Sequence, residues 1–267
     1  MSKLKFKILA IEITKKCNLK CKHCLKGDAQ DVNISDFIIE KLFSMIESID
    51  YLCITGGEPT LNIYSLKKIY QEILKNNVSI GSWSIPTNGV YSNTDFVEVC
   101  NKLTELSQDP KSCLLRISLD KYHFPDDVPE YTYYTSPRYL SYKIKKYGNY
   151  NFNIKPNYTN NWGYIKTGRA KELLEPNSLA TEKETPFKVN RINKNKINVL
   201  YVSARGDLFV DNNLTFEDED ANKYSYGNVI NLSANELIDT IHFWNEKYKD
   251  NPSSLDVDSI LHEILKG

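Results

Sequence analysis

The stretch Thr14-Lys-Lys-Cys-Asn-Leu-Lys-Cys-Lys-His-Cys-Leu25 carries three cysteines in the spacing C-x3-C-x2-C, at Cys17, Cys21 and Cys24. A cubane iron–sulfur cluster contains four irons and is usually held by four cysteine thiolates. Three closely spaced thiolates without a fourth nearby leave one iron without a protein ligand. An open coordination position distinguishes a catalytic metal site from a closed structural one. The stretch therefore predicts one [4Fe-4S] cluster with these three cysteines as its metal ligands, and a substrate or cosubstrate on the remaining iron.

Zinc is the alternative metal, with His23 or a distant residue as the fourth ligand. Zinc sites usually combine two pairs of cysteine or histidine ligands separated by a longer stretch. The sequence contains no second pair, and His23 lies between two of the cysteines, where simultaneous ligation is awkward. We therefore favour the iron–sulfur cluster.

The composition is that of an ordinary globular protein without net charge. Of 267 residues, 41% are hydrophobic and 25% are charged, and 34 Lys and Arg balance 34 Asp and Glu. This balance argues against a nucleic-acid partner, which usually requires a basic surface. Lys7 and Glu12 interrupt the first apolar segment, so it is not a signal peptide, and no apolar run has the length of a membrane span. We expect a cytoplasmic protein without a membrane partner, in which Cys53, Cys100 and Cys113 are buried, inert thiols.

Strand-like and helix-like segments alternate through the first part of the chain. Such alternation implies parallel strands, and in α/β folds the loops at the C-terminal strand ends carry the chemistry. Ser35 is a candidate N-cap of the first helix. The predicted strands are residues 6–14, 51–55, 79–86, 113–119 and 150–157, and the predicted helices are residues 35–49, 65–76, 95–106 and 137–147.

The pattern changes after about residue 176. Residues 197–202 and 208–210, joined through Arg205-Gly206-Asp207, predict an antiparallel hairpin. The acidic run Glu217 to Asp220 is expected to be a solvated loop. We therefore expect two domains, a core of residues 1–175 and an extension of residues 176–267. Further predicted segments are a polar linker at 175–185 and helices at 234–248 and 255–265.

Polar motifs follow the predicted strands in a fixed order. Gly56-Gly-Glu-Pro59 follows the second strand, Thr87-Asn-Gly89 the third and Ser118-Leu-Asp120 the fourth. With the cysteine loop and Gly168-Arg-Ala170, they resemble the radical S-adenosylmethionine (SAM) superfamily over about residues 5–172. The resemblance implies an α/β fold, a partial (β/α)6 TIM-like barrel. It also implies an enzyme that cleaves SAM reductively and uses a 5′-deoxyadenosyl radical to abstract a hydrogen atom.

The resemblance implies how the methionine and adenine ends of SAM are held. Gly56 and Gly57 let the backbone approach the amino group closely, and Glu58 adds complementary charge. Asn88 is either a polar SAM contact or an ordinary turn residue. His23 stands where the family usually has an aromatic residue beside the adenine, so we expect its ring to stack there.

The fourth predicted strand and the helix after it supply further candidates. Period-two alternation places Arg116, Ser118 and Asp120 on one strand face. Ser118 and Asp120 can hydrogen-bond the ribose hydroxyls. Arg116 is either a cation of the barrel interior or a salt-bridge partner of Asp120. Arg138 either holds the SAM carboxylate or is an exposed helix arginine.

The C-terminal part resembles the SPASM or twitch extension, in which many peptide-modifying members of the superfamily hold auxiliary clusters. Segments 204–211 and 226–232 carry this resemblance, but no cysteine follows Cys113. Asp211 and Asn212 stand about where a cysteine ligand would be expected. We therefore expect an extension retained as a scaffold without metal, and a single cluster in the chain.

This extension favours a peptide substrate, ribosomally made and undergoing epimerisation or side-chain crosslinking. A small molecule is the alternative substrate, and an iron–sulfur electron carrier or scaffold without SAM chemistry is the alternative of another class. On the substrate side, His123 is a candidate acid/base or a loop histidine, and Lys155 and Asn157 are candidate substrate contacts. The expected electron donor is a reductase, flavodoxin or ferredoxin. Only 16 residues precede Cys17, so we expect no N-terminal leader-recognition domain.

Overall fold

The computed structural model describes residues 3–90, 94–118, 123, 149–157, 168–169, 190, 192–210, 214–222 and 224–248. Several predictions lie outside these residues. They are the contacts of Asp120, Arg138, Asp211 and Asn212, the linker at 175–185, and the helices at 137–147 and 255–265.

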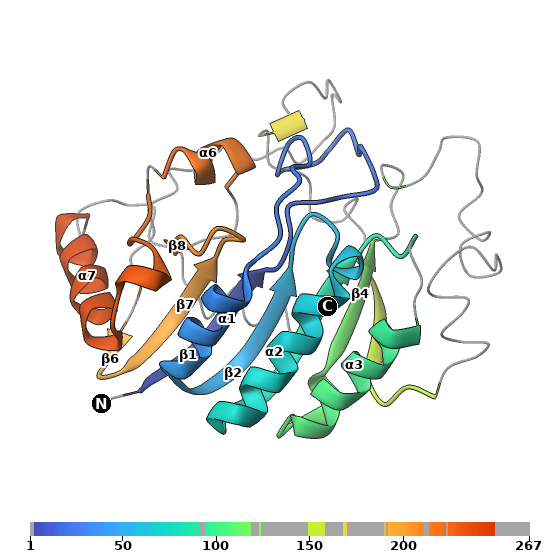
Figure 1. The fold of residues 1–267 in the computed structure, drawn as a ribbon, viewed down its shortest axis with the longest axis horizontal. Helices are drawn as coiled ribbons and strands as arrows, with labels where there is room; N and C mark the ends of the chain where they lie inside the picture. The colour runs from blue at the N-terminus through green and yellow to red at the C-terminus, as the bar shows by residue number, and fades with distance from the viewer. Residues whose placement is uncertain are drawn as a thin grey trace.

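One mixed sheet runs through the molecule, in the order β5-β4-β3-β2-β1-β7-β6, with β8 paired to β7. The strands β1 to β5 are parallel to one another, so their C-terminal ends meet at one edge (Figure 1). The predicted α/β class is confirmed. The described strands form an open sheet that ends at β5 and β6. The strands are β1 (Leu4–Glu12), β2 (Ile46–Thr55), β3 (Ser79–Thr87), β4 (Leu114–Ser118), β5 (Asn153–Asn157), β6 (Ile192–Asn193), β7 (Lys196–Val202) and β8 (Leu208–Phe209).

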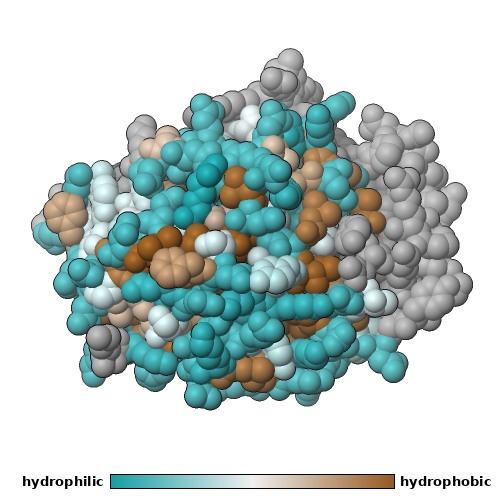
Figure 2. Space-filling view, viewed as in Figure 1, coloured by the Kyte–Doolittle hydropathy of each residue, from teal (hydrophilic) through white to brown (hydrophobic). Residues whose placement is uncertain are grey.

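Three helices cover one face of this sheet, as the alternating sequence pattern predicts (Figure 1). They are amphipathic: Ile38, Ile39, Leu42 and Phe43 of α1 are buried, and the visible surface over the three helices is mostly hydrophilic (Figure 2). The Ser35 side chain accepts a hydrogen bond from the Ile38 N–H, so the predicted N-cap is confirmed. The helical segments are α1 (Asp36–Ser44), η1 (Pro59–Leu61), α2 (Ile63–Asn76), α3 (Thr94–Leu106), η2 (Pro110–Ser112), α6 (Phe216–Asp220), η5 (Val229–Asn231) and α7 (Ala234–Lys247).

The prediction of a single helix over residues 35–49 is wrong at its C-terminal end. The helix stops at Ser44, and β2 begins at Ile46. Ile46 pairs with Leu4 and Ile49 with Phe6 in the parallel ladder with β1, and all four side chains are buried. The spacing of these isoleucines suits a helix as well as a strand, and the long-range pairing decides between them.

The C-terminal hairpin is confirmed, and it joins the core sheet directly. β7 pairs antiparallel with β8 and parallel with β1, where Leu9 lies opposite Leu200 and Ile11 opposite Val202. These four side chains are buried in the main hydrophobic core. β1 is therefore a central strand with one partner from each part of the chain. Among the described residues no helix is long and apolar enough to cross a membrane.

Candidate iron–sulfur site

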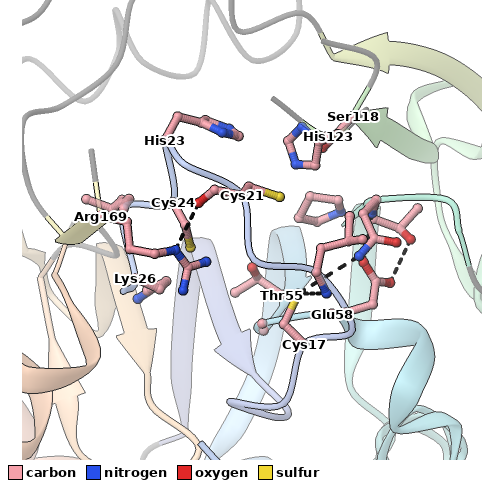
Figure 3. A pocket seen from close by; sticks show the side chains of 17 residues that line it. Cys17, Cys21, His23, Cys24, Lys26, Thr55, Glu58, Ser118, His123 and Arg169 are labelled. Atoms are coloured by element: carbon pink, nitrogen blue, oxygen red, sulfur yellow. Dashed lines mark hydrogen bonds between the residues drawn. The ribbon is translucent and has the colours of Figure 1, made fainter. Parts of the chain in front are cut away.

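The three motif cysteines lie on the loop that follows β1, above the edge where the parallel strands end (Figure 1). Cys17, Cys21 and Cys24 all line one pocket of about 320 Å³ (Figure 3). The floor of the pocket comes from the ends of β2 and β3, and Ser118 lines it from β4. The structure therefore brings the separate strand-end motifs to one place, as parallel strands require.

Gly56 and Gly57 make close contact between the end of β2 and the cysteine loop. A Cβ atom on Gly57 would stand 2.3 Å from the carbonyl oxygen of Lys16, and one on Gly56 would stand 2.6 Å from that of Thr14. The Gly57 N–H donates to the Thr14 oxygen over 2.7 Å, and the Glu58 N–H donates to the Lys16 oxygen over 2.8 Å. The absence of side chains on both glycines thus allows the loop to sit on the strand end.

Glu58 is buried, at 1% exposure, and holds the ends of β2 and β3 together. Its Oε1 accepts from the hydroxyls of Thr60 and Thr87, over 2.6 and 2.7 Å. Its Oε2 accepts from the Asn88 N–H over 2.7 Å. Burial raises the pKa of Glu58, although these hydrogen bonds lower it. Both carboxylate oxygens are engaged within the protein, and a contact with a cofactor stays a prediction.

Asn88 fixes the cysteine loop from the end of β3. Its Nδ2 donates to Oδ1 of Asn18 over 2.8 Å and reaches the Cys17 sulfur at 4.0 Å, while its Oδ1 accepts from the Val90 N–H. Asn88 is thus a turn residue that also contacts the loop. Burial raises the pKa of the neighbouring Cys17 thiol to about 11.

Gly168 and Arg169 hold the other side of the loop. Gly168 has φ +54°, and a Cβ on it would stand 2.5 Å from the Cys24 carbonyl oxygen. The Arg169 N–H donates to that same oxygen over 3.0 Å, and its Nε donates to the Cys21 carbonyl oxygen over 2.9 Å (Figure 3). Nη1 of Arg169 pairs with Asp28 at 2.9 Å. Two of the three cysteine backbone positions are therefore set by one arginine.

The predicted histidines meet over the pocket. The rings of His23 and His123 are 4.8 Å apart, edge to face at 73°, and both line the pocket (Figure 3). Lys155 lies on β5 opposite Arg116 of β4 and is not among the residues lining this pocket. Arg116 lies beside Tyr51. Burial raises the pKa of Tyr51, although a hydrogen bond with Arg116 lowers it. Arg116 of β4 therefore lies near Tyr51 of β2.

The acidic run Glu217 to Asp220 is not the solvated loop expected from the sequence. It forms most of α6, capped by Thr215 and Asp218 in a capping box, and Glu219 is 1% exposed. Glu219 and Asp220 contact lysines that flank the motif cysteines. Sequence reasoning missed these contacts because the pairing spans the chain. The capping pattern of Thr215 and Asp218 was the one local signal of a helix.

The donor set suits a cluster. Three thiols line one pocket, and hydrogen bonds from the Gly57 backbone and from the side chains of Asn88 and Arg169 hold the loop that carries them. Thiolates are the usual protein ligands of cubane clusters. No three His, Cys, Asp or Glu side chains in the described part of the chain are grouped to hold a single metal ion.

Residues 10–107 match a family model described as a 4Fe-4S single cluster domain. This match includes all three motif cysteines. Over 91 residues the chain is 29% identical to the 7-carboxy-7-deazaguanine synthase of Methanospirillum hungatei, covering 32% of this chain and 36% of that protein. The match thus spans about a third of that relative's length.

Two solved structures share the fold over most of the chain. One is histidine-tagged anSMEcpe with bound AdoMet, with a TM-score of 0.53 and 15% identity over 90% of this chain and 82% of that one. The other is native anSMEcpe with AdoMet and the Cp18Cys peptide, with a TM-score of 0.53 and 16% identity over the same shares. The likeness extends well beyond residues 10–107, into the C-terminal part of the chain.

Proposed function

We propose that this chain is a radical SAM enzyme, in which Cys17, Cys21 and Cys24 hold one [4Fe-4S] cluster and SAM binds in the same pocket. The observation that carries the proposal is the convergence of three thiols with the β2 and β3 strand-end motifs on one pocket. Its volume of about 320 Å³ is at the lower end of the range of small-molecule sites. When bound and reduced, the cluster supplies one electron that splits SAM into methionine and a 5′-deoxyadenosyl radical, which takes a hydrogen atom from the substrate.

The residues of this chain position the cofactors and exclude water. Gly56 and Gly57 set the distance between the loop and the strand end, and Glu58 fixes the backbone of Asn88. We assign the ribose of SAM to Ser118, which lines the pocket at the end of β4, with Asp120 as its predicted companion. His23 lines the pocket as the predicted neighbour of the adenine, and Arg138 keeps its predicted role at the SAM carboxylate.

A peptide is the substrate that we favour, modified by epimerisation or side-chain crosslinking. The resemblance of the C-terminal part to peptide-modifying members of the radical SAM superfamily supports this substrate. A solved structure of the same fold with a bound peptide also supports it. His123 is proposed as a substrate-side acid/base, which its place in the pocket lining supports, and Lys155 is proposed as a substrate contact from β5. A small molecule is the second candidate, because the sequence match is to a 7-carboxy-7-deazaguanine synthase. A flavodoxin, ferredoxin or reductase is the proposed electron donor.

Anaerobic reconstitution tests the proposal. The protein should bind about four irons, and strong reduction with SAM should yield 5′-deoxyadenosine, detected by mass spectrometry. Cys21→Ala should abolish both. Cys53→Ser is the matched control, because Cys53 lies on β2 outside the pocket lining, and it should retain both.

An electron carrier without SAM chemistry makes a different prediction. It would bind about four irons and give an electron paramagnetic resonance signal that SAM leaves unchanged. An altered signal on adding SAM, together with SAM cleavage, supports the enzyme. An unchanged signal without cleavage would refute the proposed function.

A further inference from the structure

Two lysines stand at matching positions on either side of the motif cysteines. Lys15 is two residues before Cys17, and Lys26 is two residues after Cys24. The Lys15 side chain is 0% exposed and that of Lys26 is 14% exposed. Lysines are almost never buried to this degree without a partner. We call residues 15–26 the cluster loop.

One carboxylate pairs with both lysines. Oε2 of Glu219 lies 3.1 Å from Nζ of Lys15, and Oε1 lies 2.5 Å from Nζ of Lys26. The same Oε1 accepts a hydrogen bond from the Tyr201 hydroxyl over 2.8 Å. Glu219 is 1% exposed, so these contacts are shielded from water and salt. A single side chain of α6 therefore connects the start and the end of the cluster loop.

The neighbouring Asp220 reinforces one end of the cluster loop. Asp220 accepts from Lys15 over 2.8 Å and from Gln30 over 2.9 Å, and it pairs with Arg205 at 3.0 Å. Although burial opposes it, the hydrogen bond from Lys15 lowers the pKa of Asp220. Asp220 touches Lys15 but is not paired with Lys26 in any contact of the described residues. Glu219 therefore pairs with the lysines at both ends of the cluster loop, whereas Asp220 pairs only with the lysine at its start.

Phe216 completes the contact between α6 and the loop. Its ring lies 4.9 Å from Nζ of Lys15 and 5.7 Å from Nζ of Lys26, both within the range of cation–π attraction. Its N–H donates to the backbone oxygen of Lys26 over 3.0 Å. Backbone and side-chain contacts thus hold α6 against both ends of the cluster loop.

We propose that Glu219 is a positioning residue that pins the two ends of the cluster loop, so that the C-terminal extension forms part of the cluster site. α6 lies outside residues 10–107, which match the single-cluster domain. The extension in this way supports the cluster site with a buried carboxylate. The link to cluster binding rests on the proposed function, whereas the link to loop order does not.

Hydrogen exchange of the metal-free protein tests the pin without any cofactor. Glu219→Gln should speed amide exchange at both ends of the cluster loop by at least about tenfold, because removing one partner of a buried ion pair leaves an uncompensated charge. Asp220→Asn should speed exchange only near Lys15. Glu217→Gln is the matched control, since Glu217 lies on the same helix with its side chain exposed, and it should leave exchange unchanged.

Iron release extends the test to the loaded protein. After reconstitution, Glu219→Gln should lose iron to a chelator at least about tenfold faster than wild type, and Glu217→Gln should match wild type. If wild type binds no iron, the proposed function fails. The exchange result for the metal-free protein still decides whether Glu219 positions the cluster loop.

Two outcomes would contradict the proposal that Glu219 positions both ends of the cluster loop. One is wild-type exchange throughout the cluster loop in Glu219→Gln. The other is faster exchange spread evenly over all strands, which would indicate general destabilisation. If Glu219→Gln does not fold, the milder Asp220→Asn decides. Faster exchange spread evenly over all strands in that variant, instead of near Lys15 alone, contradicts the proposal.

Discussion

Replacing Gly57 by alanine should loosen the cluster loop. The new Cβ would stand 2.3 Å from the oxygen and 2.8 Å from the carbon of the Lys16 carbonyl, so backbone must move. Inserting a methyl group into a packed site costs about 1–3 kcal/mol. The shift also strains the hydrogen bonds from Gly57 to Thr14 and from Glu58 to Lys16, each worth about 1 kcal/mol. Losing about half of each bond adds about 1 kcal/mol, so we expect a total loss of about 2–4 kcal/mol in the free energy of unfolding.

Urea denaturation of the metal-free protein measures this loss, and chelator-induced iron release measures its effect on the cluster. Gly81→Ala is a matched control, because a Cβ there would stand 2.3 Å from the Asp50 carbonyl oxygen between β2 and β3. Both variants should lose similar stability, but Gly57→Ala alone should release iron faster. A Gly57→Ala protein with wild-type stability and iron release would refute the argument from close packing.

Three further predictions concern single side chains. Burial raises the pKa of Glu12 to about 7, above the ordinary value of 4.5, so the stabilisation it contributes is present below pH 4.5 and is lost as pH rises through 7. Glu12→Gln should therefore gain stability relative to wild type between pH 5 and pH 8 in urea titrations, and a constant difference would contradict this. Arg169→Lys cannot reproduce the Nε bond to Cys21 and should speed iron release about fivefold, corresponding to one lost hydrogen bond; equal release rates would exclude this role. Ser35→Ala should cost about 1 kcal/mol in thermal unfolding through the lost N-cap of α1, with iron content unchanged.

Features encoded within a few residues could be predicted from the sequence. The cysteine spacing, the strand-end motifs and the N-cap at Ser35 each depend on local patterns, and the structure places Gly56, Gly57 and Asn88 around one pocket. Parallel strands bring their C-terminal ends to one edge, so the order of motifs along the chain was enough to predict their meeting.

Features that depend on distant pairing could not be predicted in the same way. The spacing of Ile46 and Ile49 is compatible with a helix, and only the ladder with β1 makes them strand residues. An acidic run such as that around Glu219 is usually solvated, and the two lysines of the cluster loop that pair with Glu219 explain its burial. A single sequence contains no local sign that residues so far apart will meet.

The central place of β1 has a consequence for biosynthesis. β1 comes first among the described strands, and its partner β7 and the helix α6 follow much later, with Lys15 and Asp220 separated by 205 positions. Contacts of such long sequence separation form slowly and leave a growing chain incomplete. The cysteines therefore leave the ribosome long before α6, whose Glu219 contacts both ends of their loop. If the contacts of Glu219 hold the cluster loop in place, a stable site for iron and sulfide forms only after α6 has been translated.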